Sequence, residues 1–196
     1  MFPWRRQDAS TYLIVLTEIL VQQTRAESVA SILPKFLRSF PNWNAIARAS
    51  ICRLETQLRR LGLWRRRARA LKNLAKDLRL KKHQWPKKRH DLEKMPAVGQ
   101  YVASAVLLFV HHRREPLLDV NMARVLERYF GPRTLADIRY DPYLQNLARR
   151  LINCSKPVFV NWAVMDLGAI HCTASRPKCE LCPIRIGCKT NAKLSK

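Results

Sequence analysis

The spacing of apolar residues is the feature that most restricts the fold of this chain. Along nearly its whole length, apolar residues recur at intervals of three and four, the period of an α-helix with one buried face. Alternating β-branched stretches are few, and the sequence holds only 5 glycines, which argues against a β-sandwich or barrel. With 196 residues, of which 47% are hydrophobic, the chain can bury a core. We therefore predict an all-α protein of one domain or two small ones.

Helix start and stop signals divide the chain into segments. Ser10 is a good N-cap for a first helix that carries the sequence TYLIVLTEILVQQT. A strongly basic helix follows Gly62 and runs from Trp64 to Leu80. A turn at Pro96–Gly99 joins a short helix to an apolar one. Further helices are predicted at residues 26–40, 43–49, 51–60, 119–129, 142–153 and 158–170.

The charge balance indicates the class of partner. The chain has 37 Lys and Arg against 14 Asp and Glu, a net charge of +23, so we expect a polyanionic partner that offsets its self-repulsion. The longest apolar run, residues 102–110, is about half the length that a membrane-spanning helix needs. The first residues lack the apolar region of a signal peptide. We expect no membrane association and a cytoplasmic protein, associated with the nucleoid if the source is prokaryotic.

Four of the 6 cysteines are grouped near the C-terminus with the spacing C-x6-C-x2-C-x5-C. They are Cys172, Cys179, Cys182 and Cys188. Short loops cost little closure entropy, so four thiolates can converge on one centre. Disulfides suit a cytosolic chain less well than a metal does, and both structural zinc and a cubane iron–sulfur cluster take four cysteines. The spacing alone leaves these two open. Cys52 and Cys154 lie on predicted apolar faces, and we expect both to be buried thiols.

Two segments resemble a known superfamily. The cysteine spacing is similar to the [4Fe–4S] loop that ends the endonuclease III and MutY families of DNA glycosylases, which implies a [4Fe–4S] cluster in loop 172–188. The sequence MPAVGQYVASAV resembles the helix-hairpin-helix turn of that superfamily, written L-P-G-V-G-x-[KYS]-T-A, although a turn of this kind also fits a simple corner between two helices. The resemblance implies that Val98, Gly99 and Gln100 direct backbone N–H groups at a DNA phosphate.

Three positions of the hairpin bear on its function. Ala97 replaces the first glycine of the pattern, where a positive φ or a close approach of DNA is needed, and Val102 replaces the usual threonine. We expect the hairpin to form with a weaker or shifted hold on phosphate. Bifunctional members carry a lysine where this chain has Tyr101, which has no amine for a Schiff base. The resemblance therefore implies a monofunctional glycosylase without strong AP-lyase activity; without it, Tyr101 fits an aromatic that packs on its helix neighbours equally well.

Two acidic segments extend the resemblance to MutY-type adenine glycosylases and MIG-type G/T mismatch glycosylases. TEILVQQT matches the helix of the catalytic glutamate, which is Glu18 here, and LDVN matches the catalytic aspartate, Asp119, with Asn121. The helical neighbours of Glu18 are mostly apolar, which would raise its pKa and suit a general acid, although a surface glutamate beside an apolar stripe also fits. Asp119 also fits an N-cap, whose N–H donors would keep it ionised.

The likeness runs from Phe2 to Cys188 and implies a fold and a division of the chain. We expect the helix-hairpin-helix glycosylase fold, with a helical barrel subdomain at residues 14–118 that includes the hairpin at about 92–106. Residues 1–13 and 119–196, from both chain ends, would form the iron–sulfur cluster subdomain. The implied partner is double-stranded DNA with a mismatched or damaged base, and we expect the enzyme to act as a monomer.

The resemblance also implies roles in base excision. The enzyme would flip the nucleotide out of the duplex, Glu18 would protonate the departing base, and Asp119 would stabilise the sugar cation, with Tyr101 and Asn121 positioning both groups. The remaining expected DNA contacts lie on three segments. Gln22 and Gln23 would fill the gap and read the opposite base, and Trp64 would be a wedge unless it is a core aromatic. Phosphate contacts would come from Arg65, Arg66, Arg67, Arg69 and residues 87–89, although any one of these side chains also fits a solvated surface position.

The excised base is indicated by a few positions. MutY-type enzymes typically place Gln or Glu after the Asn of an F-N-[QE] segment, whereas Trp162 stands here and offers a single indole donor. They also add a C-terminal domain that reads 8-oxoguanine, and this chain stops at Lys196. Ala26 matches the MIG type, whereas QQT matches MutY. We expect removal of thymine or uracil opposite guanine; the alternatives are adenine excision from A·G or A·8-oxoguanine pairs and, more remotely, a non-catalytic DNA-binding module.

Overall fold

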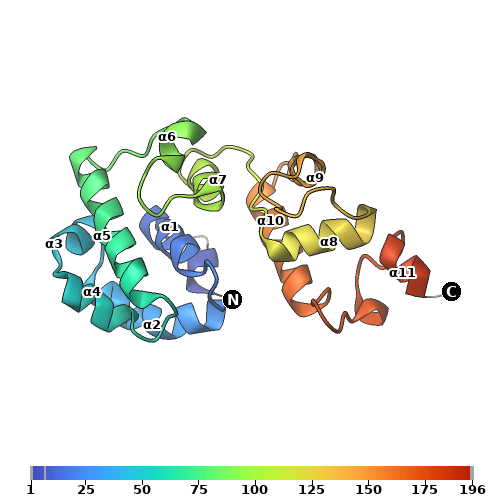
Figure 1. The fold of residues 1–196 in the computed structure, drawn as a ribbon, viewed down its shortest axis with the longest axis horizontal. Helices are drawn as coiled ribbons and strands as arrows, with labels where there is room; N and C mark the ends of the chain where they lie inside the picture. Colours follow the sequence, from blue (N-terminus) through green and yellow to red (C-terminus); the bar gives the residue numbers. More distant parts are fainter. Residues whose placement is uncertain (1, 7, 195–196) are drawn as a thin grey trace. The chain divides into compact units, whose positions relative to one another are not determined.

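The protein is described from a computed structural model, which places residues 2–6 and 8–194. Within these residues all regular secondary structure is helical, so the prediction of an all-α fold is confirmed (Figure 1). Contacts divide the chain into two compact units, Met1–His111 and His112–Lys196. Among the residues placed, no helix is long and apolar enough to cross a membrane.

In the described residues of the first unit, seven α-helices pack around one core. They are α1 (Thr11–Leu20), α2 (Ala26–Ser39), α3 (Trp43–Arg48), α4 (Ile51–Leu58), α5 (Trp64–Leu80), α6 (Arg89–Glu93) and α7 (Gln100–Phe109). The long helix α5 contacts α3 and α4, while α1 lies against α7 and α6 precedes α7 as the other arm of the hairpin (Figure 1). Fully buried side chains such as Phe36, Leu71 and Leu74 fill the centre of this core.

Local signals account for the boundaries of α1. Ser10 caps α1, since its hydroxyl accepts from the Leu13 N–H at 3.2 Å. This helix ends at Leu20, earlier than the sequence suggested, and the chain turns at Gln23, whose φ of 55° is left-handed and incompatible with a continuing helix. The prediction that Cys52 and Cys154 are both buried is wrong: Cys154 is half-buried. The helix α4 buries the opposite side, and Cys52 is exposed.

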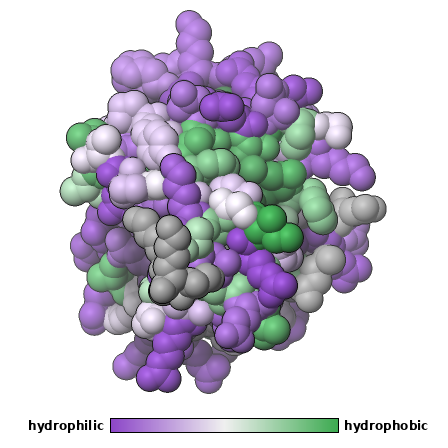
Figure 2. Space-filling view, turned by 90° about the vertical axis from the view of Figure 1, so that its right-hand side faces the viewer, coloured by the Kyte–Doolittle hydropathy of each residue, from purple (hydrophilic) through white to green (hydrophobic). Residues whose placement is uncertain are grey.

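The second unit is built on α8 (Val120–Phe130). Its other elements are α9 (Pro142–Leu151), α10 (Pro157–Ile170), the 3-10 turn η2 (Cys179–Leu181) and α11 (Lys189–Leu194). Met122, Leu126 and Leu144 lie in its small core. At Gly168, α10 crosses α8 so closely that a Cβ would lie 2.8 Å from Asn121 Cβ, so no larger residue fits there without movement. In Figure 2, hydrophilic side chains surround an apolar patch on one face.

The contact division differs from the division expected from the sequence at both boundaries. The expected border between residues 118 and 119 falls instead after His111. The N-terminal segment, which we had assigned to the cluster subdomain, groups with the first unit. Its short 3-10 helix η1 (Pro3–Arg5) contacts α1, and Trp4 is 3% exposed within the core of that unit. The burial of an indole ties this segment to the first core.

Candidate active site and cluster loop

A buried glutamate and a tyrosine meet in the first unit. Glu18, on α1, is 4% exposed, in agreement with the apolar face expected from its neighbours. Tyr101, in the first turn of α7, donates its hydroxyl to Glu18 Oε2 at 2.7 Å. Because α1 packs on α7, residues that are far apart in sequence form one polar pair within an apolar setting. A carboxyl held in this way is a candidate for proton transfer.

The second acidic residue begins α8. Asp119 is its N-cap and accepts from the backbone N–H groups of Asn121 at 3.0 Å and Met122 at 2.8 Å. The Asn121 side chain donates to its other oxygen at 2.9 Å. Burial nevertheless raises the pKa of Asp119 above its ordinary value, against the opposing effect of these bonds and of the Arg124 charge. Asp119 and Asn121 are therefore brought together as expected, in a desolvated setting.

Arg124 is a residue that the sequence reasoning missed. Its Nη2 donates to Asn121 Oδ1 at 2.8 Å and to the Gly168 carbonyl at 2.7 Å, and its Nε donates to the Cys172 carbonyl at 2.6 Å. It therefore links the partner of Asp119 to the end of α10 and to the first cysteine of the loop. Its position one helical turn after Asn121 is the signal that could have identified it.

A buried amide fixes the backbone that leads to Asp119. Asn161, on α10, is fully buried, and its Oδ1 accepts from the Leu117 N–H at 2.6 Å. Its Nδ2 donates to the carbonyls of Glu115 at 3.1 Å and Pro157 at 2.9 Å. The extended connector before α8 has no strand partner in the placed residues of this unit, so this side chain supplies bonds that a sheet would otherwise give. The sequence reasoning used Asn161 only to locate Trp162.

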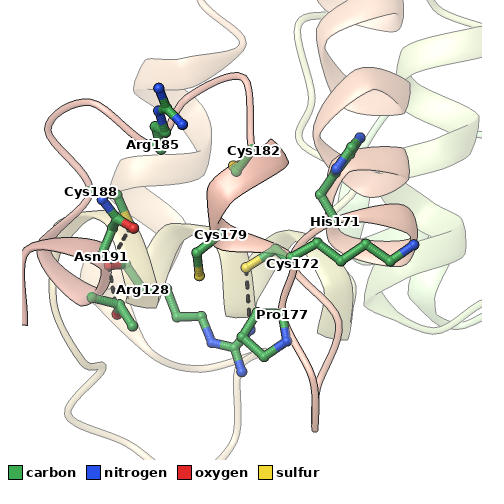
Figure 3. A pocket seen from close by; sticks show the side chains of 11 residues that line it. Arg128, His171, Cys172, Pro177, Cys179, Cys182, Arg185, Cys188 and Asn191 are labelled. Atoms are coloured by element: carbon green, nitrogen blue, oxygen red, sulfur yellow. Dashed lines mark hydrogen bonds between the residues drawn. The ribbon is translucent and has the colours of Figure 1, made fainter. Parts of the chain in front are cut away.

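The four predicted ligand cysteines line a single pocket (Figure 3). Burial raises the pKa of the Cys179 thiol, and the neighbouring thiols of the other three raise it further. Arg128 closes one side, where its Nη1 donates to Cys172 Sγ at 3.4 Å and its carbonyl accepts from Cys188 Sγ at 3.4 Å. Within the part of the chain described, no group of three His, Cys, Asp or Glu side chains is placed to hold a single metal ion.

This donor set fits a metal cluster. Four sulfurs with few competing oxygen donors suit iron–sulfur or zinc chemistry, in which the positive centre holds the thiolates deprotonated. The other polar side chains that line the pocket are those of Arg128, His171, Lys178, Arg185, Thr190 and Asn191. Arg128 also donates to the carbonyls of Thr173 at 2.7 Å and Ala174 at 2.8 Å, and thereby orders the loop after the first cysteine.

The turn between α6 and α7 has the geometry that the hairpin pattern requires. Ala97 adopts a φ of 62°, the left-handed conformation for which the family pattern has glycine. A Cβ built on Gly99 meets no atom within 4 Å, and no side chain caps α7. The first N–H groups of α7 lie there, at an exposed helix start that favours an anion. The Val98 side chain is buried in the core of the first unit and thereby holds the turn against it.

The residues expected to contact the excised base or the base opposite it lie in both units. Gln22 and Gln23 are exposed on the turn after α1, in the first unit. Ala26, the first residue of α2, is half-buried against the core of that unit. Trp162 is half-buried on α10 in the second unit. The structure thus places the two glutamines, but not Ala26, on an open surface.

The basic segment at the start of α5 contains residues in different environments. Arg65 and Arg66 are exposed, and the Arg65 guanidinium lies 3.9 Å from the centre of the Trp64 ring. Trp64 itself is half-buried against the core, whereas Leu63 before it is 56% exposed with a φ of 55°. The exposed apolar side chain of this turn is therefore Leu63, which the sequence reasoning did not select. Arg67 is half-buried and bonded to backbone carbonyls, so its predicted place among the phosphate contacts is not supported.

Comparison with known proteins settles the family. The model of the HhH-GPD superfamily of base excision DNA repair proteins matches residues 16–139. The chain belongs to this superfamily. The matched region includes the buried glutamate, the hairpin and Asp119, and the cysteine loop follows it in sequence.

Relatives within the HhH-GPD superfamily cover most of the chain. A thymine/uracil-DNA glycosylase of Pyrobaculum aerophilum is 36% identical over 93% of this chain and 80% of its own length. An adenine DNA glycosylase of Mycobacterium tuberculosis is 35% identical over 93% of this chain but only 60% of its own length. The solved structure of a thermostable thymine-DNA glycosylase superposes with a TM-score of 0.86 at 30% identity, over 98% of this chain and 89% of that one. The expected helix-hairpin-helix glycosylase fold is confirmed.

Proposed function

We propose that this protein is a monofunctional DNA glycosylase that removes thymine or uracil mispaired with guanine by hydrolysing the N-glycosidic bond. The observation that carries the proposal is the buried Glu18 bonded to the Tyr101 hydroxyl at 2.7 Å. Tyr101 stands where the lyase members of the superfamily have their lysine, and a phenol cannot form an imine. This chain covers most of the length of three relatives that are named thymine-DNA glycosylase or thymine/uracil-DNA glycosylase.

The reaction requires a proton donor and a negative charge near the sugar. Glu18 is the donor to the departing base, and it lies buried with the Tyr101 hydroxyl as its hydrogen-bond partner. Asp119 would supply the negative charge that stabilises the sugar when the bond to the base breaks, and the N–H groups of Asn121 and Met122 hold the carboxylate in place. Tyr101 orients Glu18, as Asn121 orients Asp119. These roles follow from the superfamily match together with the two polar pairs.

Binding of duplex DNA is assigned to the hairpin and to the exposed arginines. The uncapped start of α7 at Gly99 takes a backbone phosphate, where no Cβ stands in the way. Arg65 and Arg66 contribute charge on the surface of α5. Gln22 and Gln23 lie on an exposed turn and offer amide donors and acceptors to the base left opposite the gap. We place this activity in the cytoplasm, at the DNA of the nucleoid if the cell is prokaryotic.

The cysteine pocket is assigned to a [4Fe–4S] cluster. The four cysteines that line it, at the family spacing, would bind the four irons, and the cluster would act as a structural crosslink of the C-terminal loop. Arg124 would then connect this loop to Asn121 at the active site.

Adenine excision is the second candidate. Adenine DNA glycosylases that are 27–35% identical match this chain. Gln22 and Gln23 belong to the sequence QQT, which resembles the MutY type of adenine glycosylase. The chain spans only 52–60% of the length of these relatives, compared with 80–88% of the thymine and thymine/uracil relatives. Trp162, which offers one indole donor and no acceptor where the adenine branch places Gln or Glu, favours the thymine and uracil assignment.

The test is single-turnover base release from matched duplexes that contain T·G, U·G, A·G or A·8-oxoguanine, with alkali to cleave abasic sites. Release of thymine or uracil opposite guanine, without strand scission before alkali, is the expected result. Release of adenine alone would transfer the chain to the second candidate, and scission without alkali would contradict the role of Tyr101. Glu18→Gln should abolish release, whereas Glu27→Gln, which changes an exposed carboxylate at the start of α2, should leave it unchanged.

A further inference from the structure

One arginine of the basic segment of α5 faces inward. The Arg67 guanidinium has five N–H donors and meets five acceptors. Nη1 donates to the carbonyls of Leu20 at 3.1 Å and Ile19 at 3.4 Å. Nη2 donates to the Gln22 carbonyl at 2.6 Å and to Thr24 Oγ1 at 2.5 Å. Nε donates to the Gly62 carbonyl at 2.7 Å.

Four of these acceptors belong to the end of the Glu18 helix and the turn after it, and the fifth, the Gly62 carbonyl, lies just before α5. The last carbonyls of a helix have no donor within the helix, and the negative end of the helix dipole lies there. A guanidinium at this end donates hydrogen bonds to these carbonyls, and its positive charge interacts favourably with the helix dipole. The desolvation that accompanies this position lowers the pKa of Arg67 below its usual range, whereas the neighbouring Arg66 is exposed.

The turn held by Arg67 has a strained backbone and functional side chains. Gln23 has a φ of 55°, a conformation that costs a residue with a Cβ free energy and persists only where the surroundings hold it. The Gln22 carbonyl, which accepts the short Arg67 bond, lies directly before it. The hydrogen bonds from the guanidinium therefore fix the backbone from which the Gln22 and Gln23 side chains project.

We propose that Arg67 is a positioning residue that fixes the Gln22–Gln23 turn for contact with the base opposite the excised one, and that it does not bind phosphate. The contact with the opposite base rests on the proposed function, whereas the anchoring of the turn does not. A lysine at this position keeps the charge but has three donors on one atom, so it cannot replace a planar fork that reaches carbonyls on two segments. Selectivity for the opposite base should therefore depend on the guanidinium itself.

The test compares Arg67→Lys and Arg67→Gln with Arg66→Gln in the full-length, cluster-loaded protein. For DNA binding, Arg66→Gln should reduce the slope of log K against log salt by about 0.9, the value for one lost phosphate contact, whereas both Arg67 variants should keep the wild-type slope. In single turnover, the ratio of uracil release opposite guanine to release opposite adenine should fall about tenfold in both Arg67 variants and stay unchanged in Arg66→Gln. A melting temperature close to wild type for Arg67→Lys separates this effect from a general loss of structure.

Hydrogen exchange tests the anchoring without relying on activity. Backbone amides of residues 21–25 should exchange faster in Arg67→Lys than in wild type, with α2 unchanged, and Arg66→Gln should match wild type throughout. Unchanged exchange in this turn, or a salt slope reduced as in Arg66→Gln, would overturn the proposal. If wild type itself shows no preference for the opposite base, the base-reading role falls together with that part of the proposed function, and the exchange result still decides whether Arg67 anchors the turn.

Discussion

The raised pKa of Asp119 predicts that the charge of this carboxylate destabilises the fold. In Asp119→Asn the side-chain oxygen can still accept from the N–H groups of Asn121 and Met122, so the cap of α8 is kept. The variant loses the bond from Asn121 Nδ2, about 1 kcal/mol, and removes the half-buried charge. Burial raises the pKa with all three bonds in place, so the removal of the charge outweighs the lost bond. We expect Asp119→Asn to be more stable than wild type at neutral pH.

The size and the pH dependence of this gain follow from linkage. Each pKa unit by which the fold raises Asp119 corresponds to about 1.4 kcal/mol, and each kcal/mol to roughly 2–4 °C in Tm for a protein of this size. The folded protein binds this proton more tightly than the unfolded chain. The cost of the charge is therefore complete above the raised pKa and disappears as the pH falls through it towards the ordinary value of 3.8. Base release should fall at least ~100-fold in the variant.

The assay is the melting temperature of wild type and variant as a function of pH, with Asp141→Asn as the matched control. Burial raises the pKa of Asp141, but bonds from Leu135, Leu144 and Thr134 outweigh it and lower that pKa to about 2. The control should therefore melt below wild type at neutral pH, and its deficit should shrink as the pH falls towards 2. If Asp119→Asn melts below wild type at neutral pH, or its gain does not change with pH, burial is not the dominant influence on Asp119.

Three further substitutions test other contacts. Tyr101→Phe removes the hydroxyl from Glu18 and should slow base release about tenfold, the equivalent of one hydrogen bond, with little change in Tm; an unchanged rate would show that the bond does not orient the acid. Arg124→Lys cannot reproduce the fork to Asn121 and the loop, so both base release and retention of visible cluster absorbance should decrease, and a loss of only one would show that the two are not linked. Asn161→Leu leaves buried backbone groups without partners and should lower the free energy of unfolding by about 2–4 kcal/mol in denaturant titrations; a change under ~1 kcal/mol would mean that water replaces the amide.

The helical architecture was predictable because local signals and the tertiary core agree. The 3.6-residue period and the caps at Ser10 and Asp119 place helix starts correctly, since each cap satisfies N–H groups that have no other acceptor. The contact between Glu18 and Tyr101 is long-range, and no local pattern contains it. The family motifs supplied it indirectly, by marking both residues as functional.

The arginines show where sequence reasoning reaches its limit. Charge composition treats Arg66 and Arg67 alike, whereas their positions on α5 differ by 100°, which separates a solvated guanidinium from one that caps α1. Arg89 is a similar case, because it donates to Ser104 at 3.0 Å and to the Gln100 carbonyl at 3.3 Å within the hairpin. Which cations face inward depends on the packing of helices distant in sequence. The basic composition therefore predicts the class of partner but overestimates the number of phosphate contacts.

The left-handed Ala97 has a consequence for how this hairpin can change over generations. Alanine in that conformation costs roughly 1–2 kcal/mol, which glycine does not incur, although glycine gives back part of this gain because it leaves the unfolded chain more freedom. A single-nucleotide change in an alanine codon produces glycine, so a stabilised hairpin lies one mutational step away. The stability gained by this change could compensate for a destabilising substitution elsewhere in the protein. Ala97→Gly should therefore suppress such substitutions in a selection for retained activity.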